Sequence, residues 1–140
     1  MVGAGKATWL SCLPRIQILG PVALIHANPE STWRAPMPDA NDTELDSVYR
    51  PLGQPIVVYV HIHRSYVRNV GGMIVANTGS VSLSYDGDRR ASYLLLDDSE
   101  PSIRHVEYDV DAEVRALSES NLPHADWIAK ILETGSYDAP

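Results

Sequence analysis

The feature that most constrains the fold is the apolar run IVVYV at residues 56–60. A short run of β-branched and aromatic side chains fits a strand that is buried on both faces of a sheet. A second apolar run, VALIH, precedes it at residues 22–26. Between the two runs we expect a short helix with Thr43 as its cap, Asp46 three residues later and Pro51 at its end. The order strand, helix, strand predicts a βαβ unit, in which both strands lie parallel.

The rest of the chain reads as antiparallel strands followed by two helices. The dipeptide Gly71-Gly72 suits a tight turn because glycine accepts positive φ. We therefore predict an α/β fold, in which β-hairpins and two C-terminal helices follow the βαβ unit. The further strands are expected at 15–19, 65–70, 73–77, 92–98 and 102–110, with a turn around Ser99, and the helices near Val110 and Pro123, the second ending at Gly135.

The length of the chain indicates the number of domains, and its net charge indicates which ligands it can bind. The 140 residues suffice for one domain, so we expect residues 1–140 to form a single domain with a flexible stretch at 1–8. The formal net charge of -7 disfavours non-specific binding to nucleic acid. It leaves a small phosphorylated substrate open, since a metal ion can supply positive charge locally. The apolar runs are too short to cross a bilayer, and the lone Cys12 allows no internal disulfide, so we expect a cytoplasmic protein without a membrane partner.

Three histidines follow the two expected parallel strands. His26 ends the first strand, and His61 and His63 follow the second. The carboxyl ends of parallel strands meet at one sheet edge, where open α/β sheets bind ligands. In an extended segment His61 and His63 would also face the same way. A bare H-x-H pair is common by chance, but the predicted convergence of three imidazoles favours a metal site.

The remaining histidines and the tryptophans are interpreted as structural. His105 lies within an expected strand and His124 in the first turn of an expected helix, so both are structural or solvent-facing. The three tryptophans, Trp9, Trp33 and Trp127, are expected to be packing residues, although Trp33 sits in the long loop near His26.

The order of three segments resembles a known family. The segments are ALIHANPES, VVYVHIHRSYV and NTGSVSLSYDGDRRASYLLLD. Together they resemble the C-terminal half of the calcineurin-like metallophosphoesterases, and most closely their small bacterial phosphodiesterase branch. The resemblance implies a metal-dependent phosphoesterase with a partial metallophosphoesterase-like α/β sandwich.

The resemblance also implies the roles of the histidines. His26 and His61 would ligate one metal ion and His63 a second, with two divalent ions (Mn, Fe, Zn or Ni) in a complete site. Such ions clamp phosphate oxygens and lower the pKa of a water that attacks phosphorus. The implied substrate is a small phosphodiester or phosphomonoester.

The chain departs from the family pattern in two respects. The Asp-x-His, Gly-Asp and Asn-His motifs of the family's first half are absent, and with them the catalytic histidine, so we expect a truncated chain that hydrolyses phosphoesters slowly or not at all. Val60 stands where the family has glycine, and valine is costly if that position needs positive φ. Ser82 and Ser84 replace the family's common Gly and Pro.

Two other readings remain open at the level of sequence. The chain could be a degenerate, non-catalytic interaction or dimerisation module. It could also form a mononuclear site, possibly for zinc, from three histidines and water. In the truncated reading, an exposed sheet would favour a homo-oligomer.

Overall fold

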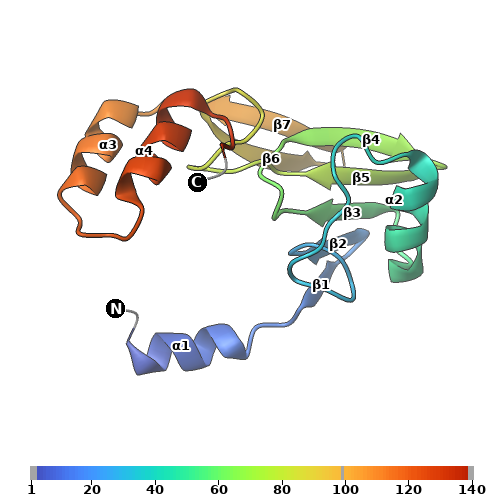
Figure 1. Ribbon diagram of the computed structural model, residues 1–140. Helices are drawn as coiled ribbons and strands as arrows, with labels where there is room; N and C mark the ends of the chain where they lie inside the picture. The colour runs from blue at the N-terminus through green and yellow to red at the C-terminus, as the bar shows by residue number, and fades with distance from the viewer. Residues whose placement is uncertain (1–2, 99, 139–140) are drawn as a thin grey trace.

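The computed structural model describes residues 3–98 and 100–138, and a mixed sheet forms its centre (Figure 1). Among these residues the sheet has five strands in the order β1-β2-β3-β5-β4. The three inner strands, β2, β3 and β5, run parallel, and β1 and β4 flank them antiparallel. The predicted βαβ unit is therefore confirmed. The strand bounds are β1 Ile16–Leu19, β2 Val22–Ile25, β3 Ile56–Tyr59, β4 Tyr66–Val70 and β5 Met73–Asn77.

A second antiparallel pair of strands packs on one face of this sheet, and one helix packs on the other face. The pair consists of β6 and β7, and α3 and α4 pack together at one end of the molecule (Figure 1). No described helix is long and apolar enough to span a membrane. The bounds are β6 Ala91–Asp97, β7 Glu100–Val106, α1 Ala4–Ser11, α2 Asp42–Tyr49, the 3-10 turn Arg50–Leu52, α3 Val110–Ser118 and α4 Ala125–Thr134.

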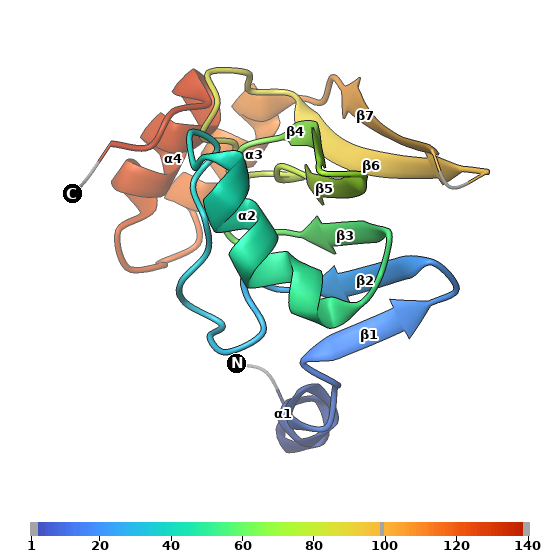
Figure 2. The same ribbon diagram turned by 90° about the vertical axis from the view of Figure 1, so that its right-hand side faces the viewer.

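The central strand β3 is buried on both faces, as its sequence predicts. Val57 and Tyr59 pack with Leu45 and Tyr49 of α2, which crosses one face of the sheet (Figure 2). The alternate side chains of β3 belong to a second cluster, against which Leu94 of β6 packs. Because side chains alternate along a strand, this apolar run contributes side chains to the hydrophobic clusters on both faces of the sheet.

The cap of α2 differs from the prediction. The capping side chain belongs to Asn41, whose Oδ1 accepts a hydrogen bond from the Glu44 backbone N–H at 2.9 Å. The prediction of Thr43 as the cap is wrong, because Thr43 lies inside the first turn. Only a residue with extended backbone that precedes the helix can turn its side chain back onto the free N–H groups.

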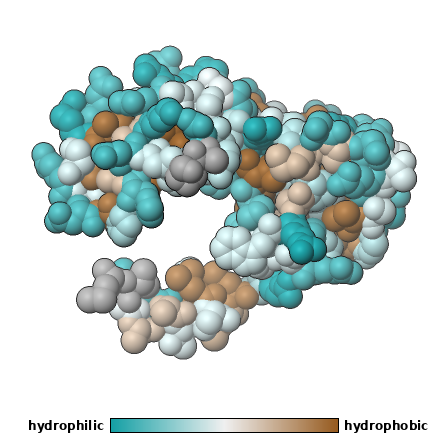
Figure 3. All heavy atoms as spheres, viewed as in Figure 1, coloured by the Kyte–Doolittle hydropathy of each residue, from teal (hydrophilic) through white to brown (hydrophobic). Residues whose placement is uncertain are grey.

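The first described helix, α1, lies within and beyond the stretch that the sequence analysis expects to be flexible. Residues 4–8 of that stretch form most of α1. Met1, Val2 and the expected turn residue Ser99 lie outside the described residues. Helix α1 buries none of its residues and stands apart from α3 and α4 across a wide hollow (Figure 3). Trp9 on this helix is 63% exposed, so the expectation that it packs is wrong.

Candidate metal centre

A tight turn at the end of β3 presents His61. Pairing between β2 and β3 ends at Ile25 and Tyr59, and the Val60 N–H then donates to the His26 carbonyl at 3.1 Å. The Ile62 N–H donates back to the Val60 carbonyl at 2.8 Å, which closes a three-residue turn around His61. Such a turn with positive φ at its centre is uncommon and strained.

The backbone of the H-x-H pair is not extended, so this part of the prediction is wrong. His61 has φ of 71° and His63 has φ of 56°. Val60 is absent from the described residues with positive φ, so the expected strain at this valine does not arise. The strained conformation falls one residue later, on histidine, which tolerates the left-handed region better than a β-branched residue does.

Asn77 at the end of β5 holds this turn in place. Its side chain is fully buried, its Nδ2 donates to the Val60 carbonyl at 2.7 Å, and its Oδ1 accepts from the Gly79 N–H at 3.0 Å. A side chain at Gly79 would collide with Ser92, so the segment after Asn77 also has little freedom to move. Asn77 therefore positions the turn that carries His61.

The structure brings His26 and His61 together. The Nε2 atom of His26 and the Nδ1 atom of His61 lie 3.2 Å apart, and their rings meet edge to face with centroids 5.1 Å apart. In this structure the contact is a hydrogen bond between the two rings. Two nitrogens bound to one zinc ion at about 2.0–2.1 Å, with an angle between about 90° and 109°, are about 2.8–3.4 Å apart. The separation of the two nitrogens is therefore also compatible with a pair of ligands to a single ion, once the shared proton is lost.

In the imidazole rings of His61 and His63, a backbone carbonyl determines which ring nitrogen carries the proton. His61 Nε2 faces the Trp33 carbonyl at 3.0 Å, and His63 Nδ1 faces the Leu83 carbonyl at 2.7 Å. A carbonyl only accepts, so both nitrogens must donate. Neutral His61 therefore keeps its lone pair on Nδ1, facing His26, and neutral His63 keeps its lone pair on Nε2. Carbonyl contacts of this kind orient metal-binding histidines in proteins.

The protonation of His26 favours a ligand role at neutral pH. Partial burial, followed by the charges of His61 and His63, lowers the pKa of His26 below its ordinary value. A ligand histidine must be neutral, and a lowered pKa keeps the ring neutral over a wider range of pH.

His63 stands beside this pair without completing a three-ligand set. Its ring stacks on Tyr85 with centroids 4.8 Å apart. In residues 3–98 and 100–138, no group of three or more His, Cys, Asp or Glu side chains is placed to hold a metal ion. Of the three imidazoles predicted to converge, the structure brings only those of His26 and His61 into contact. The geometry therefore does not favour the mononuclear three-histidine reading.

Side chains of the sheet and of α2 hold the loop between β2 and α2 through hydrogen bonds to its backbone carbonyls. The hydroxyl of Tyr49 donates to the Ala27 carbonyl at 2.8 Å, and that of Tyr59 donates to the Pro36 carbonyl at 2.9 Å. Burial raises the pKa of both tyrosines, so they stay protonated and donate. The Arg68 guanidinium donates to two further carbonyls of this loop, those of Pro38 and Ala40. The loop can therefore hold the Trp33 carbonyl against His61.

A cleft of about 380 Å³ opens beside His61. The anchored loop, the turn after β3 and two tyrosines from later in the chain form its walls. Its lining includes Trp33, Arg34, His61, Arg64, Tyr85 and Tyr137. Trp33 is 83% exposed, so the expectation that it packs in the core is wrong.

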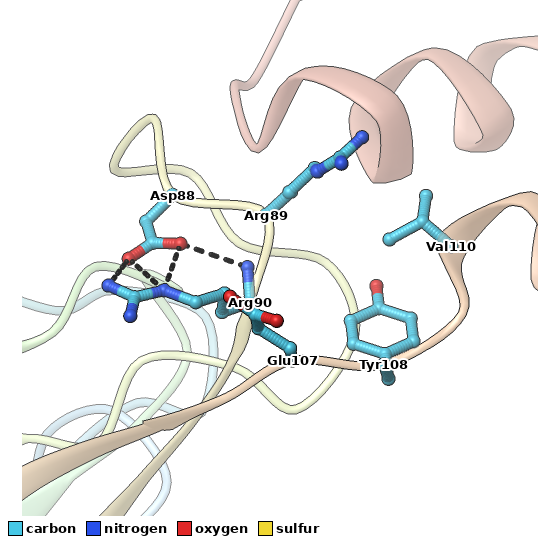
Figure 4. A pocket seen from close by; sticks show the side chains of 6 residues that line it. All are labelled: Asp88, Arg89, Arg90, Glu107, Tyr108 and Val110. Atoms are coloured by element: carbon cyan, nitrogen blue, oxygen red, sulfur yellow. Dashed lines mark hydrogen bonds and ion pairs between the residues drawn. The ribbon is translucent and has the colours of Figure 1, made fainter.

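A second cavity, of about 360 Å³, lies between the segment that precedes β6 and the segment that follows β7 (Figure 4). The ion pair between Asp88 and Arg90 lies in its wall, and hydrogen bonds from Arg90 lower the pKa of Asp88 to about 2. An ion pair this exposed contributes little to stability, because water screens it. The two serines that depart from the family pattern lie in the loop before this cavity: buried Ser84 donates to Asp86, and the Ser82 carbonyl accepts from Tyr108.

Two kinds of group that shape the site carry little or no signal in the sequence. One is Asn77, for which the only signal is a polar residue at the end of the apolar run MIVAN. The other is the pair of backbone carbonyls of Trp33 and Leu83, which no sequence pattern marks.

Comparison with known proteins supports the fold. No protein-family model and no curated protein matches the chain. A metallophosphoesterase from Sphaerobacter thermophilus is similar in structure, with a TM-score of 0.79 and 22% identity over 96% of this chain and 63% of its own. A hypothetical protein from Pyrococcus horikoshii OT3 is similar with a TM-score of 0.81 and 17% identity, over 97% and 56%. The chain spans less than two thirds of either structure, and it has the metallophosphoesterase-like fold that its sequence predicts.

Proposed function

We propose that the chain supplies the histidine side of a metal-dependent phosphoesterase site. The observation that carries this proposal is the 3.2 Å separation of His26 Nε2 and His61 Nδ1 at the carboxyl ends of two parallel strands. In this proposal His26 and His61 bind one divalent ion, and His63 binds a second through its free Nε2. Mn, Fe, Zn and Ni are all compatible with imidazole ligands.

In this proposal the residues of the chain bind and orient the metal ions, and the ions supply the positive charge that the reaction needs. When bound, two divalent ions would offset the charge of the phosphate oxygens and lower the pKa of a water, so that hydroxide is available as the nucleophile toward phosphorus. The carbonyls of Trp33 and Leu83 hold the imidazoles with their lone pairs turned toward the ions. The substrate in this proposal is a small phosphodiester or phosphomonoester, and we place the activity in the cytoplasm because a lone cysteine needs no oxidising compartment.

Full activity requires carboxylates beyond those that the described residues place beside the histidines. Imidazoles are neutral, so they leave the charge of the ions poorly balanced. We therefore expect the chain alone to bind metal weakly and to act slowly, and expect an added carboxylate-bearing segment to raise both.

The test is hydrolysis of bis(p-nitrophenyl) phosphate by the chain with added Mn²⁺. We expect a slow rate that disappears with a chelator and falls at least about tenfold in His61→Ala, since even indirect partners of a metal ligand contribute tenfold or more. His105→Ala, a histidine on β7 outside the site, serves as the matched control and should keep the rate. The absence of any metal-dependent rate, or the same rate in His61→Ala, would contradict the proposal.

The second candidate function is a non-catalytic dimerisation module. The outer edge of β1, which pairs with no further strand among the described residues, favours it. Strand β1 is the first in the sheet order, and its Ile18 and Leu19 are 47% and 52% exposed. An exposed apolar edge can pair with the same edge of a second copy. We expect sedimentation velocity to show a dimer that grows with concentration and that Ile18→Lys weakens. A monomer at all concentrations would remove this candidate.

A further inference from the structure

The N-terminal arm, residues 3–15 including α1, is exposed along its whole length. Every residue of the arm is exposed, and its three large apolar side chains, Trp9, Leu10 and Leu13, are 63%, 52% and 47% exposed. Helices shorter than about 12–15 residues are only marginally stable in water without tertiary packing. Helix α1 has eight residues and buries none of them. The arm therefore needs a surface to pack on.

One side of the arm combines apolar side chains with positive charge. Residues at spacings of three and four share one side of a helix. This side of the arm carries Lys6, Trp9, Leu10 and Leu13. The Leu13 N–H donates to the Leu10 carbonyl at 3.2 Å, so the helical turn continues to Leu13. Arg15 adds a second positive charge, and the first 29 residues contain no acidic side chain, although the net charge of the chain is -7.

The α3–α4 pair, residues 109–134, carries the opposite charge. It has six acidic against two basic side chains. None of these six carboxylates forms an ion pair within residues 3–98 and 100–138. The connection between the two helices lies at the end of the pair nearest α1 (Figure 1) and holds Leu122, which is 54% exposed. Val114 and Ile128 of the two helices are only half-buried. The pair thus offers an acidic surface with apolar side chains in it.

The two complementary surfaces lie on opposite sides of the hollow and do not meet within one chain. Figure 3 shows apolar atoms on α1 below the hollow and on the α3–α4 pair above it. Only residues 12–15 join α1 to β1, and Pro14 restricts the backbone of this short link. The arm is therefore held away from its own α3–α4 pair, whereas the hollow is open to the arm of another copy. A reciprocal exchange of arms would give a closed two-fold dimer.

We propose that the chain forms a dimer in which the arm of each copy enters the hollow of the other and packs its apolar side on that copy's α3–α4 pair. Burial of Trp9, Leu10 and Leu13 supplies most of the affinity. Lys6 and Arg15 lie against the unpaired carboxylates and fix the orientation of the arm. This interface is separate from the outer edge of β1, and it does not depend on the metal site.

Sedimentation velocity on the full chain tests the dimer, with Leu10→Asp in the arm and Leu122→Asp in the α3–α4 pair as variants. Each should raise the dissociation constant of the dimer at least about tenfold, because burial of one leucine side chain contributes about that factor or more. Val81→Asp makes the same kind of change at a side chain that is 70% exposed and lies outside both surfaces, so it should leave the dissociation constant unchanged. Circular dichroism confirms that each variant is folded.

Charge reversal tests the contact between the arm and the carboxylates. Lys6→Glu should raise the dissociation constant of the dimer more than Arg104→Glu does. Arg104 is an exposed residue of β7 outside both surfaces, so its reversal changes the net charge equally and controls for general repulsion between two acidic chains. Equal effects of the two reversals would contradict the docking of the arm on the acidic surface.

Intermolecular paramagnetic relaxation locates the docked arm. Cys12 is the only cysteine and is exposed at the end of α1, so it can carry a nitroxide label. The labelled chain is mixed with ¹⁵N-labelled Cys12→Ser chain, in which only amides near the arm of another copy are broadened. We expect broadened amide signals within residues 109–134. Broadening confined to β1, or no broadening where the dimer is populated, would overturn the inference.

A dimer through the β1 edge gives a different set of results. Ile18→Lys should leave the proposed dimer intact, because Ile18 lies outside both surfaces. A dimer that Ile18→Lys dissociates and Leu10→Asp does not would assign the interface to the β1 edge and overturn the inference. A chain that stays monomeric at all concentrations, including one whose α1 binds phosphatidylserine vesicles instead, would also overturn it.

Discussion

Replacing Asn77 by leucine is expected to lower the free energy of unfolding by about 2–6 kcal/mol, because it leaves one buried and one partly buried backbone group without partners, each costing about 1–3 kcal/mol. These groups are the Val60 carbonyl and the Gly79 N–H, which the Asn77 side chain contacts at 2.7 Å and 3.0 Å. The side chain is fully buried, so water cannot replace either contact. Urea unfolding followed by circular dichroism measures the change.

Asn69→Leu is the matched control for this prediction. The Oδ1 of Asn69 accepts from the Gly72 N–H at 3.0 Å, as Asn77 does for Gly79, but at an exposed turn where water can take over. We expect this change to cost less than about 1 kcal/mol. Asn77→Asp keeps the acceptor and loses the donor to Val60, and should be destabilised as well. Equal stability of Asn77→Leu and Asn69→Leu would contradict the role given to Asn77.

The second large effect is expected on metal affinity. His26→Ala and His61→Ala should each weaken binding of Zn²⁺ at least about tenfold, as removal of even an indirect partner of a ligand does. The reason is that the two facing ring nitrogens, 3.2 Å apart, are proposed to bind the same ion, so each single variant loses one of its two imidazole ligands. Isothermal titration calorimetry measures the affinity of each variant.

Combining the two substitutions sharpens this prediction. If both rings hold one ion, the double variant should bind Zn²⁺ hardly more weakly than either single variant, since residues that act as a unit are not additive. His105→Ala should bind like the wild type. Multiplicative losses in the double variant would show that the two histidines contribute independently, which would contradict the prediction that they act as a unit.

The βαβ unit could be predicted because its signals are local. The run at 56–60 is apolar at every position, and only a strand buried on both faces accommodates such a run. His26 and His61 follow directly from this, because parallel strands of known register end at the same edge. The same reasoning places any polar residue that follows either strand near the site.

The turn around His61 could not be predicted in this way. The alternation rule assumes that the strand continues, whereas contacts from 17 residues away stop it: Asn77 holds the Val60 carbonyl, and the chain turns back after it. The exposure of Trp33 likewise depends on distant anchors, the hydroxyls of Tyr49 and Tyr59 beneath the loop. Apolarity alone assigns a tryptophan to the core, and only the path of the loop shows that this one faces the cleft.

The most direct test of the histidine site is the zinc K-edge X-ray absorption spectrum of the zinc-loaded chain. The proposal predicts imidazole nitrogens at about 2.0–2.1 Å from zinc, with the scattering pattern of the ring. The imidazole signal should fall in His26→Ala and in His61→Ala, and remain unchanged in His105→Ala. A spectrum without imidazole scattering, or one that is the same in the wild type and in the His26→Ala, His61→Ala double variant, would contradict the assignment of these residues as ligands.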